Sequence, residues 1–164
     1  MSSSTSSARK LVQRIKRRIT PFYYEIVYLL ATPSHVNTMN FGYAPITNEL
    51  RPKYPSSDQG LQYELYWQAF KQLEAPLTSE QVICEVSSGR GGGLAFLRNF
   101  TDAKIIGLER SPAARRYARK YFQLDTRAAT APNLPLEDNS VDVFLSVEAA
   151  HNYHNDAFIA DLQR

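Results

Sequence analysis

A glycine-rich segment in the middle of the chain has the residue types and spacing of a ligand-binding turn. An apolar run that begins at Val82 ends at Ser87, and a turn rich in glycine then leads into an amphipathic segment, Leu94 to Phe100. Residues without a Cβ let the backbone adopt positive φ angles and let a ligand lie against the main chain at the positive end of a helix. The pattern predicts a strand, a tight turn and a helix, with a small polar ligand above Gly89 and Gly91.

The spacing of these glycines does not fit the dinucleotide-binding fingerprint. That fingerprint requires a third Gly or Ala three residues after Gly91, and the residue there is Leu94. The neighbouring registers fail as well, because one meets Phe96 and the other begins at Ser87. The chain also lacks the G-x-x-x-x-G-K-S/T loop that binds nucleotide phosphates.

Three blocks in chain order instead resemble the S-adenosylmethionine-dependent methyltransferases of the Rossmann-like class. The first, Glu85 to Gly91, resembles their motif I, an acid followed by a G-x-G-x-G pattern, although Ser87 replaces the first glycine. The second, Ile105 to Glu109, is a short apolar run ending in an acid 18 residues after Gly91. The third, Asn133 to Val147, resembles the segment that leads into the fourth strand of that fold. Three ordered blocks are a more specific signal than one glycine turn.

The resemblance implies an α/β fold, a Rossmann-like doubly wound parallel sheet with strand order 3-2-1-4-5, preceded by N-terminal helices. Four strands are predicted, over residues 82–87, 104–109, 125–130 and 141–147. The sequence ends within a periodic segment, Ala157 to Leu162 and beyond, before the fifth strand of that fold. We therefore expect an incomplete sheet, the N-terminal part of a methyltransferase, in which the bare apolar edge of the fourth strand promotes self-association.

The same resemblance implies S-adenosylmethionine as the cofactor and suggests which residues bind it. Glu109 would accept hydrogen bonds from both ribose hydroxyls, since a carboxylate can accept from two donors. Thr130 stands where the family commonly has an acid that accepts from the adenine amino group, so the bond there would be neutral and weaker by roughly 1 kcal/mol. The backbone N–H of Ala131 would meet the adenine ring. The other implied cofactor-binding residues are Glu85, Ser87, Gly89, Gly91, Tyr66 and Tyr43.

Two segments ahead of the glycine turn carry aromatic residues that could reach the ligand. Residues 31–60 lack a stable periodicity and predict a loop across the mouth of the site. Within this loop, Met39 to Tyr43 resembles the M-N-x-G-Y/W segment of small-molecule methyltransferases, so Tyr43 either closes over cofactor and substrate or anchors the loop on the core. Gly60 to Leu73 predicts an amphipathic helix, on which Tyr66 packs in the core or lies near the methionine end of the cofactor.

The segment after the fourth predicted strand carries the candidate catalytic residues. It runs from Val147 to Tyr153 and looks most like enzymes that methylate sterols, phthiotriol-type lipids or related polyketide and terpenoid products. Methyl transfer depends on alignment and on exclusion of water, and it needs a base only when the nucleophile loses a proton. Glu148 and His151 are the candidates for that base or for orienting the substrate. The alternatives are an exposed or capping His151, and a Glu148 that bonds the cofactor amino group or a loop N–H.

These features predict methyl transfer from S-adenosylmethionine to a hydroxyl or carbon of a lipid-like or polyketide/terpenoid-like small molecule. The alternative is a catalytically inactive cofactor-binding fragment or regulatory module. Glu109, Glu148 and His151 favour the enzyme, whereas the ending of the chain and Thr130 favour the inactive module.

The N-terminal region differs in character from the rest. The chain divides into a disordered tail (1–8), an N-terminal helical and lid region (9–60) and an S-adenosylmethionine-binding domain (61–164). Residues 9–19 hold six basic residues, Pro21 is expected to end that helix, and residues 22–30 begin an apolar and aromatic one. Three interpretations of the basic helix remain open: a solvated element leading into the lid, an interfacial helix on anionic lipid, and a mitochondrial presequence. We expect a cytoplasmic protein, with peripheral membrane contact ranked second and a mitochondrial location third.

Composition fits a single globular domain and narrows the partners. The chain has 164 residues, 43% hydrophobic and 21% charged, enough to bury a sizeable core. Its net charge is +3; residues 1–30, with six basic residues and one acid, contribute +5, so the remainder carries −2 and no nucleic-acid partner is expected. Cys84 stands alone in a predicted strand and no Cys/His cluster has metal-ligand spacing, so neither a disulfide nor a metal site is expected.

Overall fold

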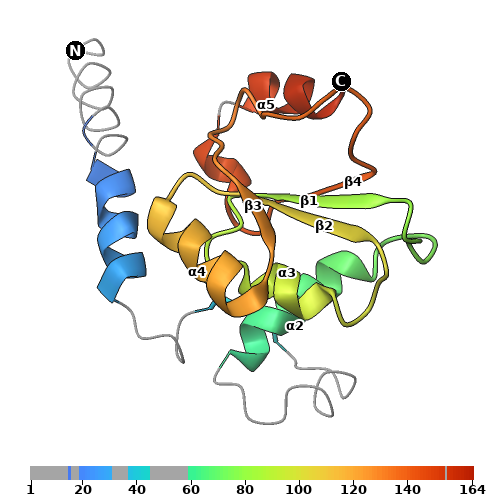
Figure 1. Cartoon of the computed structure of the whole chain (residues 1–164), viewed down its shortest axis with the longest axis horizontal. Coiled ribbons are helices and arrows are strands. Elements are labelled where there is room, and N and C mark those ends of the chain that lie inside the picture. Colours follow the sequence, from blue (N-terminus) through green and yellow to red (C-terminus); the bar gives the residue numbers. More distant parts are fainter. Residues whose placement is uncertain (1–14, 16–18, 31–36, 45–58, 154) are drawn as a thin grey trace, which may run out of the picture.

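A four-stranded parallel sheet with helices on both faces forms the centre of the computed structural model, which describes residues 15, 19–30, 37–44, 59–153 and 155–164 (Figure 1). The strands are β1 (Val82–Val86), β2 (Lys104–Leu108), β3 (Asp125–Arg127) and β4 (Val143–Leu145). Their order in the sheet is β3-β2-β1-β4, which confirms the predicted doubly wound arrangement. All four strands lie where they were predicted, but each is shorter than its predicted range.

The register of the strands brings their carboxyl ends to one edge of the sheet. β1 pairs with β2 from Val82↔Lys104 to Val86↔Leu108, and with β4 from Ile83↔Val143 onward. The loops that leave β1, β2 and β4 therefore begin close together, which is where ligands bind in open parallel sheets. Among the described strands β4 pairs only with β1, so the expected self-association through its other edge stays a prediction.

Helices cover the two faces of the sheet unequally. On one face lie α2 (Gly60–Phe70), α3 (Gly92–Leu97) and α4 (Pro112–Phe122), and on the other α5 (Asn155–Leu162) (Figure 1). Side chains alternate along β1: Cys84 and Val86 pack in one cluster with Phe158 of α5, whereas Glu85 points to α2. The burial of Cys84 agrees with its predicted place inside a strand.

Helix α4 was not predicted, although its start signals are present in the sequence. Ser111 is the N-cap, its hydroxyl accepts from the Ala114 N–H at 3.1 Å, and Pro112 occupies the first turn. Both residue types are typical of helix N-termini. The helix ends at Gln123, which has a φ of 50°. Helix α3 also differs from prediction, since it begins two residues earlier, among the glycines.

A helix over residues 19–30 packs beside the N-terminus of α4. The Glu25 carboxylate accepts hydrogen bonds from the Ala113 N–H (3.1 Å) and the Ser111 hydroxyl, which places a negative charge at the positive end of α4. Residues 19–30 are helical without a break at Pro21, so the expectation that Pro21 ends a helix is wrong; the fixed φ of proline suits a helix, and its ring costs one backbone donor. The tail, most of the basic segment and residues 31–36 and 45–58 of the predicted loop lie outside the described residues.

Gly93 tests the packing of α2 on α3. A Cβ at this position would lie 1.9 Å from the Tyr66 ring. Alanine normally stabilises a helix relative to glycine by about 1 kcal/mol, but overpacking a core costs roughly 1–3 kcal/mol. We therefore expect Gly93→Ala to lower the free energy of unfolding measured in urea. Combining it with Tyr66→Ala should reveal a favourable coupling, because the obstacle is then absent; a stabilised Gly93→Ala variant would contradict the contact.

Candidate functional site

The turn after β1 has a backbone conformation that restricts the residues it can contain. Ser87, Gly89 and Gly91 all have positive φ angles, of 63°, 55° and 78°. A Cβ at Gly91 would also lie 2.5 Å from Leu124 Cδ1, so glycine is required there for space as well as for conformation. Ser87 adopts the left-handed conformation at the position where the family has its first glycine, which accounts for the usual residue there.

Glu109 joins the end of β2 to this turn. Its Oε2 accepts from the Gly89 N–H at 2.9 Å and its Oε1 accepts from the Ser111 N–H at 2.7 Å. The residue is 8% exposed. Burial raises the pKa of Glu109, and the N–H groups of Ser111 and Gly89 offset part of that effect. The structure thus places an acceptor-rich carboxylate directly at the glycine turn, where the sequence predicted it.

A second buried carboxyl group lies beneath the turn. The Tyr66 hydroxyl donates to Glu85 Oε1 at 2.6 Å, and Glu85 is 1% exposed. Glu85 Oε2 has no hydrogen-bond partner among the described residues. Burial raises the pKa of Glu85 to about 8; the bond from Tyr66 lowers it and the charge of Glu109 raises it further. The Tyr66 ring packs in the core, which is one of the two expectations, and its place near the methionine end of the cofactor stays a prediction.

The helix at residues 19–30 covers the turn from outside. The Tyr28 hydroxyl would lie 2.9 Å from a Cβ built on Gly89, and burial, followed by the charge of Glu109, raises the pKa of Tyr28. Arg90 is buried, donates to the Tyr28 carbonyl, and holds its guanidinium 4.4 Å from the centre of the Tyr117 ring. The sequence analysis missed these residues, because no local signal connects residue 28 with a turn 60 residues later.

Tyr153 approaches the same turn from the segment after β4. Its hydroxyl is hydrogen-bonded to Ser87 Oγ. Burial raises the pKa of Tyr153, and the charges of Glu109 and Glu85 both contribute to that rise. The sequence analysis placed Tyr153 in the catalytic segment without assigning it a function, and only the tertiary contact reveals its position beside the two acids.

The two candidate catalytic residues take different positions. Glu148, with a φ of 53°, accepts from the Phe41 N–H at 2.9 Å through Oε2, which is the loop bond foreseen as an alternative. His151 is exposed in a short 3-10 helix, η1 (Ala150–Asn152), with its Nε2 3.1 Å from the Asn152 amide. Among the described residues no hydrogen bond joins His151 to the turn, so its catalytic assignment stays a prediction.

The remaining predicted positions flank the site. The Tyr43 N–H donates to the Leu61 carbonyl at 2.9 Å, which anchors the loop on α2 while the side chain stays exposed. The Ala129 N–H lies 3.4 Å from the Glu109 carbonyl, so the chain after β3 runs beside the end of β2. Thr130 and Ala131 follow directly, the first exposed and the second packed on the cluster around Cys84. Their contact with an adenine ring stays a prediction.

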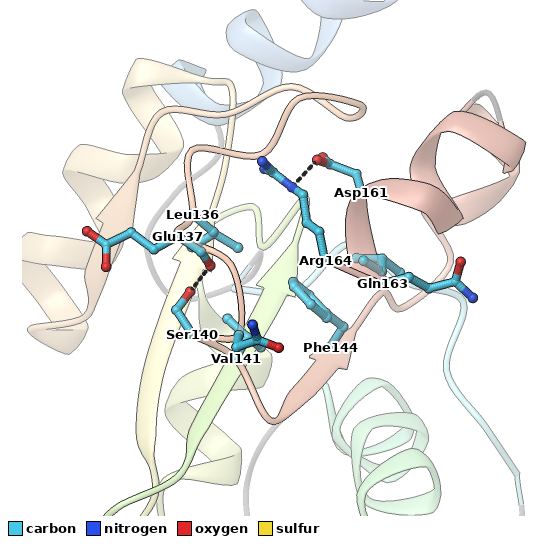
Figure 2. A pocket seen from close by; sticks show the side chains of 10 residues that line it. Leu136, Glu137, Ser140, Val141, Phe144, Asp161, Gln163 and Arg164 are labelled. Atoms are coloured by element: carbon cyan, nitrogen blue, oxygen red, sulfur yellow. Dashed lines mark hydrogen bonds and ion pairs between the residues drawn. The ribbon is translucent and has the colours of Figure 1, made fainter.

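A shallow hollow of about 110 Å³ lies elsewhere, between the segment 136–141, β4 and the end of α5 (Figure 2). Figure 2 shows Arg164 at its rim, paired with Asp161 at 2.9 Å. None of the predicted site residues lines it. Within the described part of the chain, no cluster of His, Cys, Asp and Glu has the makings of a metal site. Nor does any helix there combine the length and apolar character needed to cross a bilayer.

Comparison with known proteins agrees with this geometry. Residues 84–164 match the methyltransferase domain family. The phthiotriol/phenolphthiotriol dimycocerosates methyltransferase of Mycobacterium tuberculosis (strain ATCC 25618 / H37Rv) is 38% identical over 105 residues, which are 61% of this chain and 38% of that protein. Its counterpart in Mycobacterium leprae (strain TN) is 29% identical over 154 residues, 90% of this chain and 56% of that protein. The chain thus spans about half the length, or less, of the curated relatives it matches.

Solved structures share the fold at low sequence identity. Geranyl diphosphate C-methyltransferase from Streptomyces coelicolor A3(2), in complex with Mg²⁺, geranyl diphosphate and S-adenosyl-L-homocysteine, superimposes with a TM-score of 0.69 at 11% identity, over 87% of this chain and 58% of that one. A geranyl diphosphate methyltransferase in complex with GPP and sinefungin superimposes with a TM-score of 0.68 at 13% identity, over 87% of this chain and 61% of that one.

A parallel sheet of this order, with a glycine turn after β1 and an acid at the end of β2, defines a Rossmann-like cofactor-binding domain. The match to methyltransferases, with solved neighbours that bind S-adenosylmethionine or its product, supports S-adenosylmethionine as the cofactor. In sequence and fold the chain is similar to the S-adenosylmethionine-dependent methyltransferases of the Rossmann-like class. Within that class it is similar to the mycobacterial phthiotriol enzymes.

The raised pKa of Glu85 predicts a pH-dependent stability. The ordinary pKa is 4.5 and the folded value is about 8, so between these values the folded protein binds more protons than the unfolded chain, and stability falls as pH rises. Glu85→Gln keeps an acceptor for Tyr66 and cannot ionise. In thermal melts without ligand, the variant should match the parent near pH 5 and exceed it by roughly 1–3 kcal/mol near pH 8. The exposed Glu80→Gln is the control, and parallel pH profiles for Glu85→Gln and parent would contradict the assignment.

Proposed function

We propose that this chain transfers a methyl group from S-adenosylmethionine to a hydroxyl or carbon of a lipid-like or polyketide/terpenoid-like small molecule. The observation that carries the proposal is the Glu109 carboxylate, which accepts from the N–H of Gly89 in a turn with left-handed backbone at Gly89 and Gly91. The mycobacterial relatives, whose printed names specify phthiotriol-type acceptors, support a lipid-like substrate. The chain matches only part of each relative, so their acceptor serves here as a guide.

The residues around the turn suit the two polar ends of the cofactor. Glu109 can accept from vicinal hydroxyls with the lone pairs that its two N–H partners leave free. The open Oε2 of Glu85 is a buried acceptor suited to an ammonium group, whose positive charge would lower the raised pKa of that acid. Bound S-adenosylmethionine supplies a methyl group already activated on sulfur. The protein must then hold the acceptor in line and exclude water.

The loop at residues 37–44 supplies an apolar wall for the acceptor. Phe41 is 93% exposed, and Met39 and Tyr43 are also exposed, although all three are large and apolar or aromatic. Glu148 fixes this loop to the segment after β4 through the Phe41 N–H. We propose that these side chains contact an apolar acceptor and that His151, on the same segment as Glu148, accepts the proton when the nucleophile is a hydroxyl.

The alternative function is a cofactor-binding module without turnover. Its cofactor site would be the same, so binding experiments cannot separate it from the enzyme. A turnover assay can separate the two functions. The cytoplasmic location that the sequence predicts is compatible with either of them.

Cofactor binding tests the site itself. Glu109→Ala removes the acceptor at the turn, and we expect calorimetric titration with S-adenosylhomocysteine to show binding weaker by roughly 1–3 kcal/mol. Glu80→Ala, an exposed acid just before β1, is the matched control and should bind like the parent. A folded Glu109→Ala variant with parental affinity would exclude Glu109 from cofactor binding.

Turnover tests the enzyme against the inactive module. Incubation with methyl-labelled S-adenosylmethionine and a phthiotriol-type lipid alcohol should yield labelled lipid. His151→Ala should lower kcat by roughly 100-fold or more while leaving S-adenosylhomocysteine affinity unchanged, as expected of a general base. Asp156→Asn, an exposed change in α5, should retain activity. Cofactor binding without transfer to any lipid or polyketide acceptor would favour the inactive module.

A further inference from the structure

Exposed apolar side chains are concentrated on one helix. Of the fourteen large hydrophobic side chains that are exposed among the described residues, eight lie on the helical residues 15 and 19–30, and three more on the loop 39–43. The exposed fraction reaches 77% for Leu30 and 68% for Phe22. Single exposed apolar residues are ordinary, but a contiguous apolar face is typical of an interaction surface. We call Ile19, Phe22, Tyr23, Ile26, Leu29 and Leu30 the outer face of this helix.

The opposite side of the same helix is held by the fold. Glu25 accepts from Ala113 and Ser111 at the start of α4, and Tyr28 covers the glycine turn. The backbone carbonyl of Tyr28 also accepts from Arg90. The acid Glu25 and the aromatic Tyr28 are therefore directed inward, toward α4 and the glycine turn, whereas the large side chains of the outer face are exposed. This inverts the usual amphipathic arrangement of a surface helix.

The sequence that leads into this helix is strongly basic. Residues 9–18 contain six basic residues and no acid, and the first acid of the chain, Glu25, bonds the start of α4. The neighbouring α4 adds the exposed Arg116 and Lys120. Aromatic and aliphatic side chains flanked by Lys and Arg are the composition of helices that lie in the interface of an anionic bilayer. Two copies pairing through this face would instead bring together the exposed basic residues of both α4 helices, which opposes association.

We propose that the outer face of the helix at residues 19–30 docks the protein on an anionic lipid surface. The apolar side chains enter the headgroup region and the adjacent basic residues meet the lipid phosphates. The inner side of the helix touches the cofactor turn through Tyr28, so docking would place the methyl-transfer site next to the membrane that holds a lipid-like acceptor. This last step rests on the proposed function, whereas the docking itself does not.

Vesicle flotation of the full chain tests the docking. The protein should float with vesicles of phosphatidylcholine mixed with phosphatidylglycerol. A much smaller fraction should float with pure phosphatidylcholine vesicles. The triple variant Phe22→Ser, Leu29→Ser, Leu30→Ser should lower the bound fraction about 10-fold or more, because it removes three large apolar side chains from the face. Ile159→Ser is the matched control, since it removes an exposed aliphatic side chain from α5, on the other side of the sheet. Raising the ionic strength to about 0.5 M should weaken binding of the parent.

Folding and self-association are measured on the same samples. The triple variant should keep the parental affinity for S-adenosylhomocysteine, which shows that the cofactor site is intact. Equal binding of variant and parent to anionic vesicles would overturn the proposal. Failure of the parent to bind anionic vesicles would also overturn the proposal. So would a parental dimer, seen by sedimentation, that the triple variant does not form, because the face would then bind a second copy of the chain. Labelled lipid formed by a parent that does not bind vesicles would overturn the docking alone, whereas vesicle binding without methyl transfer would leave docking in place and contradict the proposed function.

Discussion

The hydrogen bond from the Gly89 N–H to the Glu109 carboxylate ties the ends of two neighbouring strands together, and the arrangement of the site depends on it. The bond requires a turn that leaves β1 with left-handed backbone at Ser87, Gly89 and Gly91. Parallel pairing of β1 with β2 then brings Glu109 within reach. With its other oxygen Glu109 holds Ser111, which begins α4, so one carboxylate sets the positions of the turn, the strand end and a helix.

Two acids buried in one site are costly in the absence of a ligand. Burial raises the pKa of both Glu85 and Glu109, and the charge of Glu109 raises that of Glu85 further. Hydrogen bonds from backbone N–H groups offset part of the cost of burying Glu109. A hydrogen bond from Tyr66 does the same for one oxygen of Glu85. A site built for packing alone would not bury an acid with an open oxygen, because an unmet buried acceptor is destabilising. Strain of this kind is characteristic of positions selected for binding.

Secondary structure could be predicted where local signals are strong. β1 and β4 are apolar runs bounded by polar residues, and parallel strands buried on both faces require such runs. β3 is the polar edge strand Asp125–Arg127. Helix α4 was missed although Ala114, Ala118 and Phe122 recur at helical spacing. Ser111 and Pro112 also mark its start. Pro21 misled the prediction because proline interrupts a helix only where its missing N–H and its ring cannot be accommodated. The shortened β3 and β4 reflect pairing, which a propensity pattern does not contain.

The sequence alone determined the chemistry of the cofactor site, because the glycine turn and the acids at the ends of the first two strands are local features with fixed spacing. It could not determine what surrounds them. Tyr28, Tyr117 and Tyr153 reach the turn from separate elements, and Glu148 bonds a loop 107 residues away in the chain. Contacts of that separation depend on how the helices pack on the sheet. The outward direction of the apolar side chains on residues 19–30 likewise follows from the docking of Glu25 on α4, a tertiary contact that no periodicity in the sequence specifies.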